Sequence, residues 1–435
     1  MRRENTMRIS MVSEHASPLA TVGGVDAGGQ NVHVAELSAA LVRRGHDVTV
    51  FTRRDSERLH WEQTLPNGVR LVNVDAGPAH AVPKDKLLPY IPAFAEQLAN
   101  YWTDNPPNIV HGHFWMSGIA SIEAVGKLQK QLLPPPVVAE TFHALGVVKR
   151  RHQGTDDTSP AEREFLEPWV ARSVDRVIAT CPDEAFELRQ LGVNRRRISV
   201  APCGVDVEKF TPEGPARARG KRLRLAVVGR LVPRKGVDIV VSALALLAAS
   251  GRRDIELLVV GGTSGKDRIA SDPEARRLRE LADSLGIGSQ VIFVGQVPRD
   301  EMPELFRSLD AVVCTPWYEP FGIVPLEAMA CGVPVIVSAV GGLQESVVDG
   351  VTGIHVPPKH PAALADAIAI LADDPELRAR FGAAGVERTR TRYTWDRVAS
   401  DTERIYRAML DHWDQPEADV AASRSRLRRV GEGAR

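Results

Sequence analysis

The most informative segment of the chain is Thr315-Pro-Trp-Tyr-Glu-Pro-Phe-Gly-Ile-Val-Pro-Leu-Glu-Ala-Met-Ala-Cys-Gly-Val-Pro-Val-Ile-Val337. An apolar run at 311–314 precedes it, and a second run at 333–337 closes it. A buried strand, a loop, a helix and another buried strand therefore follow one another, which predicts a parallel α/β unit. Amides that open the helix beside a glycine suit phosphate, because unpaired N–H groups and the helix dipole both favour anions.

Two acidic residues in this segment could each bind a different part of a ligand. Glu319 stays in the predicted loop, where it could hold a hydroxylated ligand. Glu327 is expected about two turns into the helix, where its carboxylate could take a pair of ribose hydroxyls. Two unrelated surface acids are the alternative, but few surface loops are as apolar as the Pro-Phe-Gly-Ile-Val-Pro-Leu between them. The pattern favours a ligand site.

This stretch resembles the signature of family 4 of the retaining glycosyltransferases, whose two-domain fold is called GT-B. The resemblance implies that Glu319 holds hydroxyls of the transferred sugar and that Glu327 binds the ribose of a nucleotide-sugar donor. It also implies that sugar and phosphate are contacted by the amides of Phe321, Gly322, Ile323 and Val324.

Length and composition narrow the class of protein. A chain of 435 residues is too long for one ordinary core and predicts two large domains. Its 55 basic and 55 acidic residues cancel, so no global field favours nucleic acid or an anionic membrane. The four cysteines are scattered, which argues against a disulfide framework or a zinc site and favours the cytoplasm. No apolar window is long enough for a transmembrane segment, whereas peripheral membrane contact stays open.

A glycine-rich loop follows the predicted opening strand at 7–13. The segment 23–37 matches neither Gly-x-Gly-x-x-Gly nor a P-loop, so the standard nucleotide loops are not favoured. It resembles the Asp-x-Gly-Gly-Gln/Met loop of two family members, the sucrose-phosphate synthases and the mycothiol-pathway D-inositol-3-phosphate N-acetylglucosaminyltransferase. That resemblance implies donor contacts from Gly28 and Gly29, and acceptor contacts from Gln30 and Asn31.

Histidines stand at the ends of two predicted strands. His111 and His113 have the spacing of metal ligands, but no third ligand lies near in sequence, so loop packing or sugar contact is favoured. His143 follows the strand that begins at Val137, and a lone histidine there is usually structural. The family resemblance instead places His143 against the transferred sugar, as a catalytic residue.

A polar stretch, 149–163, is expected to be loop-like before a helix from about residue 161. It is either a solvated charge run or an acceptor phosphate pocket, since arginine offers bidentate geometry to phosphate. The resemblance to the mycothiol enzyme implies phosphate contacts from Arg163 and Lys86. Phe114 and Ala144 replace two hydroxyl-bearing residues of that enzyme, which argues against inositol phosphate as the acceptor.

The second half supplies the domain boundary. Residues 198–210 resemble the family segment that closes the first domain, and 211–221 has the Pro-, Gly- and Arg-rich composition of a linker. The expected organisation is an acceptor-binding domain (1–210), the linker (211–221), a nucleotide-sugar domain (222–394), a crossover helix (395–413) and a disordered tail (414–435).

Two cations flank a turn at the carboxyl end of the strand 222–228. Open α/β sheets bind ligands at such ends, and two cations there can stabilise a departing diphosphate. The family pattern Gly-Arg-Leu-x-x-x-Lys-Gly implies this role for Arg230 and Lys235. In relatives the loop after the strand 291–294 lines the base pocket, which makes Val297 and Arg299 donor-binding candidates.

Taken together, the resemblance implies an α/β GT-B fold: two Rossmann-like, doubly wound domains facing a cleft, with a C-terminal helix crossing back to the first domain. The implied activity is retaining, metal-independent transfer of a hexose from UDP-glucose or UDP-N-acetylglucosamine to a small, phosphorylated sugar or polyol. The nucleotide sugar is a co-substrate, and no cofactor or metal is expected. The catalytic candidates are His143, Glu319, Arg230 and Lys235.

Three alternatives remain. Within the class, the chain could transfer mannose from GDP-mannose to a lipid or glycan. A nucleotide-sugar 2-epimerase shares the architecture but would not be expected to keep both Glu319 and Glu327. A non-catalytic nucleotide-sugar-binding partner should have lost a catalytic position, yet all four are present. No nucleic-acid partner is expected, and a homodimer stays open.

Overall fold

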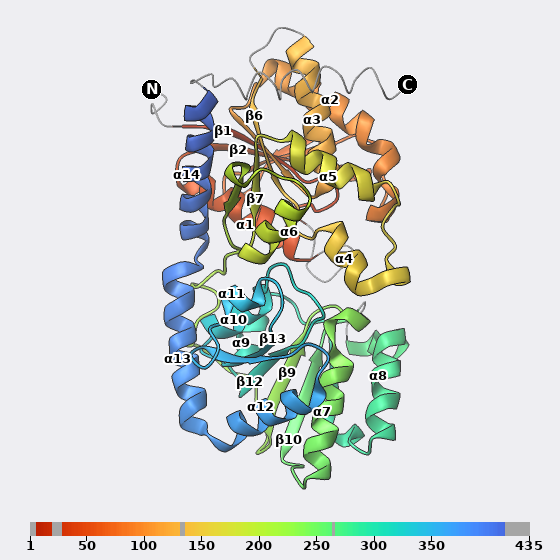
Figure 1. Cartoon of the computed structure of the whole chain (residues 1–435), viewed down its shortest axis with the longest axis vertical. Helices are drawn as coiled ribbons and strands as arrows, with labels where there is room; N and C mark the ends of the chain where they lie inside the picture. The colour runs from red at the N-terminus through yellow and green to blue at the C-terminus, as the bar shows by residue number, and fades with distance from the viewer. Residues whose placement is uncertain (1–5, 20–27, 131–134, 263–265, 414–435) are drawn as a thin grey trace. The chain divides into compact units, whose positions relative to one another are not determined.

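The structure is a computed structural model that describes residues 6–19, 28–130, 135–262 and 266–413. The described chain forms two compact units (Figure 1). Of the described residues, the N-terminal unit holds 6–19, 30–130, 135–201 and 398–413, and the C-terminal unit holds 28–29, 202–262 and 266–397. Each unit is a largely parallel sheet with helices packed on it, which confirms the predicted fold class.

The N-terminal unit is built on an eight-stranded sheet in the order β3-β4-β2-β1-β5-β6-β7-β8. Every neighbouring pair is parallel except β3 with β4. Its strands are β1 (Arg8–Val12), β2 (Asp47–Arg53), β3 (Glu62–Thr64), β4 (Arg70–Val74), β5 (Ile109–His113), β6 (Val137–Thr141), β7 (Arg176–Ala179) and β8 (Ile198–Val200). The central strands are buried along nearly their whole length, as expected for a sheet covered on both faces.

The helices of this unit are α1 (Gly29–Arg43), α2 (Ile91–Asp104), α3 (Trp115–Lys130), α4 (Gly146–Gln153), α5 (Arg163–Ser173) and α6 (Pro182–Gln190). Helices α2, α3 and α5 share one core, to which they contribute Phe94, Trp115 and Val170. Because parallel strands all end at one edge, the loops after β1, β5 and β6 gather there.

The C-terminal unit has a six-stranded, wholly parallel sheet in the order β11-β10-β9-β12-β13-β14. Its strands are β9 (Leu223–Val228), β10 (Ile255–Val260), β11 (Val291–Gly295), β12 (Ala311–Cys314), β13 (Val335–Ser338) and β14 (Gly353–Val356). Its helices are α7 (Val237–Ala249), α8 (Pro273–Ser284), α9 (Met302–Phe306), α10 (Ile323–Ala330), α11 (Leu343–Ser346), α12 (Pro361–Asp373) and α13 (Pro375–Arg392).

Alternate residues of the C-terminal strands enter two different cores. Leu225 and Val227 of β9 pack with α7, α8 and α12, whereas Ala226 packs with α9 and α10. Because successive side chains of a strand point to opposite faces, helices cover both faces of this sheet.

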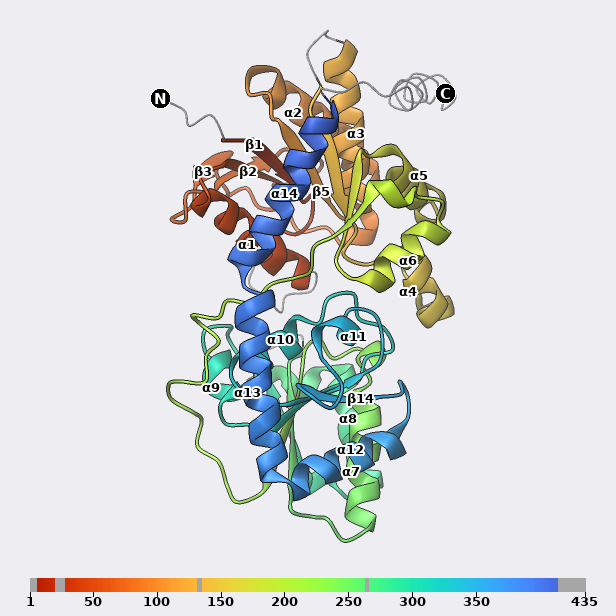
Figure 2. The ribbon, with the colours of Figure 1, turned by 60° about the vertical axis from the view of Figure 1, so that its left-hand side comes forward.

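Helix α14 (Trp395–Trp413) runs along the N-terminal unit beside α1, as Figure 2 shows. The Tyr406 hydroxyl lies 2.6 Å from His111 Nδ1 of β5 in a fully buried contact. Near the end of α1, Arg44 Nε donates to Glu403 Oε2 at 2.6 Å. From Val398 onward this C-terminal helix therefore belongs to the N-terminal unit.

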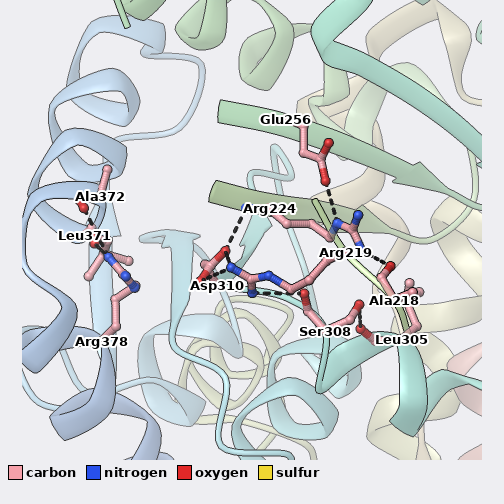
Figure 3. Close-up of polar contacts among 10 residues, drawn as sticks. All are labelled: Ala218, Arg219, Arg224, Glu256, Leu305, Ser308, Asp310, Leu371, Ala372 and Arg378. Carbon is pink, nitrogen blue, oxygen red and sulfur yellow. Dashed lines mark hydrogen bonds and ion pairs between the residues drawn. The ribbon is translucent and has the colours of Figure 1, made fainter. Parts of the chain in front are cut away.

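The segment predicted as a linker, 211–221, is bound to the C-terminal unit (Figure 3). The Arg219 guanidinium lies 2.9 Å from an Asp310 carboxylate oxygen. Arg224 of β9 donates to the Ala218 carbonyl oxygen at 3.0 Å. These contacts fix the approach of the chain to the first strand of the second sheet.

One local expectation was wrong. Residues 149–152 were expected to be loop-like but lie in α4. The Gly146 amide at the start of α4 donates to Glu167 Oε1 at 2.6 Å, and Arg151 of α4 donates to Glu187 at 2.6 Å. Sequence patterns do not indicate this helix, because its polar residues form no apolar stripe. Carboxylates on other helices stabilise it instead.

Two remaining sequence expectations concern membranes and the C-terminus. No helix within the described residues is long and apolar enough to span a bilayer. The tail expected at 414–435 lies outside the described residues.

Candidate active site

The backbone of the turn after β9 is bound to the segment 315–337. Gly236 has a φ of +67°, and a Cβ on it would lie 2.1 Å from the Thr315 carbonyl oxygen, so only glycine fits. The Thr315 hydroxyl donates to the Gly236 carbonyl oxygen at 3.0 Å. The Trp317 amide donates to the Arg234 carbonyl oxygen at 2.8 Å. The cationic turn and the acidic loop are therefore held side by side.

This contact brings together Lys235 and Glu319, two predicted catalytic residues. Lys235 Nζ forms an ion pair with Glu319 Oε2. Burial alone would raise the pKa of Glu319, but the nearby Lys235 and Arg234 outweigh burial and lower that pKa below its ordinary value. Glu319 is consequently a charged carboxylate at neutral pH, able to accept hydrogen bonds from hydroxyls.

Two glycines fix the backbone of Glu319 from the other side. The Gly342 amide donates to the Glu319 carbonyl oxygen at 2.9 Å. A Cβ on Gly341 would lie 2.3 Å from the same oxygen. The turn at 234–236 on one side and the glycines at 341–342 on the other thus set the backbone position of Glu319.

Helix α10 begins later than expected. Gly322 precedes it with a φ of +77°, a left-handed conformation that suits glycine. Glu327 therefore lies about one turn into the helix rather than two. The expectation was wrong because the loop continues through Gly322. The amides of Ile323 and Val324 open the helix, where N–H groups favour an anion.

Glu327 and Arg299 are paired in the same unit. The Arg299 guanidinium forms an ion pair with Glu327, with 2.6 Å between a guanidinium nitrogen and a carboxylate oxygen, and the Glu327 side chain is buried. The Arg299 guanidinium also lies over the Phe210 ring, 5.3 Å from its centroid. Val297, on the same loop after β11, is partly buried against the core. The structure thus joins the predicted ribose-binding acid to the predicted base-pocket loop.

The remaining donor candidates lie at element ends. Arg230 is exposed and follows Gly229, whose φ is +144°. Gly28 directly precedes α1, and Gly29 opens it. Residues 23–27 of the predicted glycine loop lie outside the described residues.

A cluster of histidine rings occupies the carboxyl edge of the N-terminal sheet. His143 Nε2 lies 2.9 Å from His113 Nδ1, and the two ring planes are inclined by 27°. The ring of His33, from α1, stands edge-on to His143 with centroids 5.1 Å apart. His143 has a φ of +62°, an uncommon conformation for a residue with a side chain and one found at functional sites.

These imidazoles are neutral. Burial lowers the pKa of His33 to about 4 and that of His111 to about 3. Burial, followed by the neighbouring histidines, lowers the pKa of His113 and of His143 well below the ordinary value. His143 is therefore suited to hydrogen bonding and not to carrying a positive charge. Within the described residues, no three His, Cys, Asp or Glu side chains are grouped to hold a metal ion.

The side-chain amides of Gln30 and Asn31 support the loops of this edge. Gln30 Nε2 donates to the Ser13 hydroxyl at 3.2 Å and to the His113 carbonyl oxygen at 3.1 Å. Asn31 Nδ2 donates to the Ser17 carbonyl oxygen at 2.9 Å. Both hydrogens of Gln30 Nε2 are thus used within the protein, and the Gln30 carbonyl oxygen is the group suited to meet a ligand.

Arg163, a predicted phosphate ligand, is bound within the protein. Its side chain is buried and its Nε donates to Glu167 Oε2 at 2.8 Å. Its guanidinium also donates to the Ala144 carbonyl oxygen and lies 4.9 Å from the centroid of the Phe114 ring. Ala144 and Phe114, the two positions at which a hydroxyl was expected to be missing, therefore both contact Arg163.

Lys86, the second predicted phosphate ligand, is exposed. The neighbouring Asp85 accepts a hydrogen bond from the Thr158 hydroxyl at 2.7 Å. Residues 84–86 and 155–159 are consequently adjacent, as the phosphate-pocket hypothesis requires.

Two contributors were missed in the sequence. His33 lies in the first turns of α1, two positions after Asn31, and its place in the glycine segment was the available signal. Arg234 stands beside Lys235 within the quoted cationic pattern, and its charge helps lower the pKa of Glu319.

Comparison with known proteins identifies the family. Residues 27–209 match the family model described as "Glycosyltransferase Family 4", and residues 213–388 match "Glycosyl transferases group 1". A D-inositol 3-phosphate glycosyltransferase of Acidothermus cellulolyticus is 37% identical over 439 residues, covering 98% of this chain and 94% of the relative. The chain belongs to the family 4 glycosyltransferases.

Further relatives agree with this assignment. A D-inositol 3-phosphate glycosyltransferase of Kribbella flavida is 38% identical over 419 residues, covering 93% of this glycosyltransferase and 96% of the relative. Among solved structures, a sucrose-phosphate synthase from Thermosynechococcus elongatus aligns with a TM-score of 0.82 and 32% identity, covering 93% of this chain and all of that one. The predicted family, GT-B fold and enzyme class are thereby confirmed.

Proposed function

We propose that this family 4 glycosyltransferase transfers a hexose, with retention, from UDP-glucose or UDP-N-acetylglucosamine to a small phosphorylated sugar or polyol. The contact between Lys235 and Glu319 carries the proposal. It joins a cation suited to a diphosphate leaving group to an acid suited to sugar hydroxyls, within a single unit of the chain.

The donor groups supply the charge that the departing diphosphate needs. Lys235 and Arg234 lie beside Glu319, and exposed Arg230 follows the same strand. As the anomeric carbon–oxygen bond to the diphosphate breaks, these cations stabilise the negative charge that develops. The acceptor oxygen bonds to the same face of the anomeric carbon, and its proton passes to the departing diphosphate oxygen. Protein cations supply the charge stabilisation in this scheme, and we propose that no metal is required.

The acceptor proposal rests on relatives and on one part of the N-terminal unit. The similar proteins include enzymes named for D-inositol 3-phosphate and for sucrose phosphate, so a phosphorylated small acceptor is the common element. Lys86 is the exposed cation that we propose for the acceptor phosphate. Arg163 would first have to exchange its contact with Glu167.

A substrate panel tests this proposal directly. Purified enzyme is incubated with UDP-glucose, UDP-N-acetylglucosamine or GDP-mannose, each with inositol 1-phosphate or fructose 6-phosphate, with and without EDTA. We expect turnover of one UDP-sugar with one acceptor, α-configured product by NMR, and an EDTA-insensitive rate. Turnover of GDP-mannose alone, an inverted product or a strict Mg²⁺ requirement would each contradict a named part of the proposal. No turnover would favour a non-catalytic partner.

A matched pair of variants tests the role of the cationic turn. Lys235→Met removes the ammonium that pairs with Glu319, and we expect kcat to fall on the order of 10²–10³-fold. Lys127→Met removes an ammonium that pairs with Glu96 on the outside of α2 and α3, and the rate should not change. Equal rates for the two variants would refute the leaving-group assignment.

A further inference from the structure

His113 lies between two groups that together determine its hydrogen position. Its Nε2 lies 3.4 Å from Met11 Sδ, and its Nδ1 lies 2.9 Å from His143 Nε2. Met11 and His113 are both fully buried. A thioether sulfur has no hydrogen and can only accept a hydrogen bond.

A neutral imidazole carries one N–H and one acceptor nitrogen. A hydrogen on His113 Nδ1 would turn the lone pair of Nε2 toward the lone pairs of Met11 Sδ. A hydrogen on Nε2 instead gives that sulfur a donor and leaves Nδ1 as an acceptor. The second arrangement satisfies both nitrogens of His113, and His143 Nε2 must then supply the hydrogen between the two rings.

We infer that Met11 and His113 act as positioning residues that fix His143 in the tautomer with hydrogen on Nε2 and an acceptor lone pair on Nδ1. Resting on the proposed function and on the sugar contact that the family resemblance implies for His143, this makes His143 accept a hydrogen bond from a hydroxyl of the transferred sugar at Nδ1. It excludes a role in which His143 donates a proton from that nitrogen. The order of donation is from His143 to His113 and from His113 to Met11.

The neighbouring His111 belongs to a separate hydrogen-bond chain. The Thr141 hydroxyl donates to the Ile178 carbonyl oxygen at 2.9 Å, so it accepts from His111 Nε2, 2.9 Å away. His111 Nδ1 then accepts from the Tyr406 hydroxyl. Because both ring nitrogens of His111 are used by Tyr406 and Thr141, Tyr406→Phe is a matched control within the same cluster.

Nitrogen NMR of protein with ¹⁵N-labelled histidine reads the tautomer directly, because protonated and unprotonated ring nitrogens resonate far apart. The His143 signals are assigned by their loss in His143→Gln. We expect Nε2 of His143 to be protonated in the wild type and in Tyr406→Phe. His113→Leu and Met11→Leu remove one acceptor each and should give a mixture of tautomers. His113→Asn, whose side-chain carbonyl can replace the lost acceptor, should restore the wild-type tautomer.

Kinetics provide the second measurement. His113→Leu should lower kcat tenfold to a hundredfold, on the order expected for a misplaced contact in the active site. Its KM for the UDP-sugar should stay within about threefold of the wild-type value, and His113→Asn should recover most of the rate. A hydrogen on Nδ1 of His143 in the wild type, or an unchanged tautomer in His113→Leu, would overturn the inference. Failure of the proposed function appears differently: no UDP-sugar would be turned over, although the wild-type tautomer is the one expected.

Discussion

Replacing Glu140 with glutamine should change how the stability of the N-terminal unit depends on pH. Glu140, on β6, is fully buried, and among the described residues neither of its carboxyl oxygens has a hydrogen-bond partner. Its side chain lies over two glycines of neighbouring elements: a Cβ on Gly112 would stand 2.1 Å from Glu140 Oε2, and one on Gly118 would stand 2.9 Å from it.

The electrostatic surroundings set the sign of this effect. Burial raises the pKa of Glu140 well above its ordinary value of 4.5, and three nearby acids, Glu14, Glu167 and Glu184, raise it further. The folded chain therefore keeps Glu140 protonated at a pH where the unfolded chain ionises it. Stability contributed by this group is full below pH 4.5 and decreases as the pH rises toward the folded pKa.

The magnitude follows from proton linkage. Where the folded chain retains one proton that the unfolded chain releases, the free energy of unfolding falls by about 1.4 kcal/mol for each unit that the pH rises. Glu140→Gln removes the titrating group and keeps the shape, so its advantage over the wild type should grow by about that amount per unit above pH 4.5. Below pH 4.5 the advantage should stop changing with pH, because both side chains are then neutral, which provides an internal control.

Urea unfolding at a series of pH values, followed by circular dichroism, measures the difference. If the free energies of unfolding of the two chains run parallel from acid to neutral pH, Glu140 is ionised in the folded protein. The reasoning from burial would then be wrong.

Three further outcomes follow from other contacts. Burial alone would raise the pKa of Glu403, but hydrogen bonds from two arginines lower it to about 2. The stability that Glu403 contributes is full above pH 4.5 and is lost as the pH falls toward 2. In Glu403→Gln the free energy of unfolding, followed by circular dichroism, should therefore fall less between these pH values than in the wild type. Gly236→Ala places a methyl group 2.1 Å from the Thr315 carbonyl oxygen and should lower Tm and kcat together; Gly251→Ala, also at positive φ but in open space, should leave kcat unchanged. Tyr406→Phe should cost about 1 kcal/mol of unfolding free energy in urea, and no loss would argue against the buried hydrogen bond of α14.

The parts of the site that sequence could predict are those encoded within a few consecutive residues. The strand, loop and helix around Glu319 follow from apolar runs and a glycine, and helix α14 begins and ends where its pattern does. The start of α10 was less accessible: Glu327 was expected about two turns into the helix, but the positive φ of Gly322 keeps the helix from beginning before Ile323. Such an error moves Glu327 by one turn without changing the family match.

Contacts between segments that are distant in sequence could not be predicted from local sequence patterns. Met11, His113 and His143 come from β1, β5 and the loop after β6, and only the strand order places them together. The pairing of Arg163 with Glu167 is different, since an arginine and a glutamate four positions apart on a helix are an ordinary ion pair. That signal was present in the sequence and competed with the phosphate hypothesis.

The ion pairs of the C-terminal unit bear on how a donor would bind. Glu319 pairs with Lys235, and Glu327 pairs with Arg299, so each proposed donor-binding acid already has a cationic partner. Burying an uncompensated charge is costly, and these pairs avoid that cost while holding all four side chains in place. A diphosphate that attracts Lys235 would take over the partner of Glu319 just as sugar hydroxyls become available to that carboxylate. Donor binding in this scheme exchanges one set of compensated charges for another, which makes the affinity depend on geometry more than on net charge.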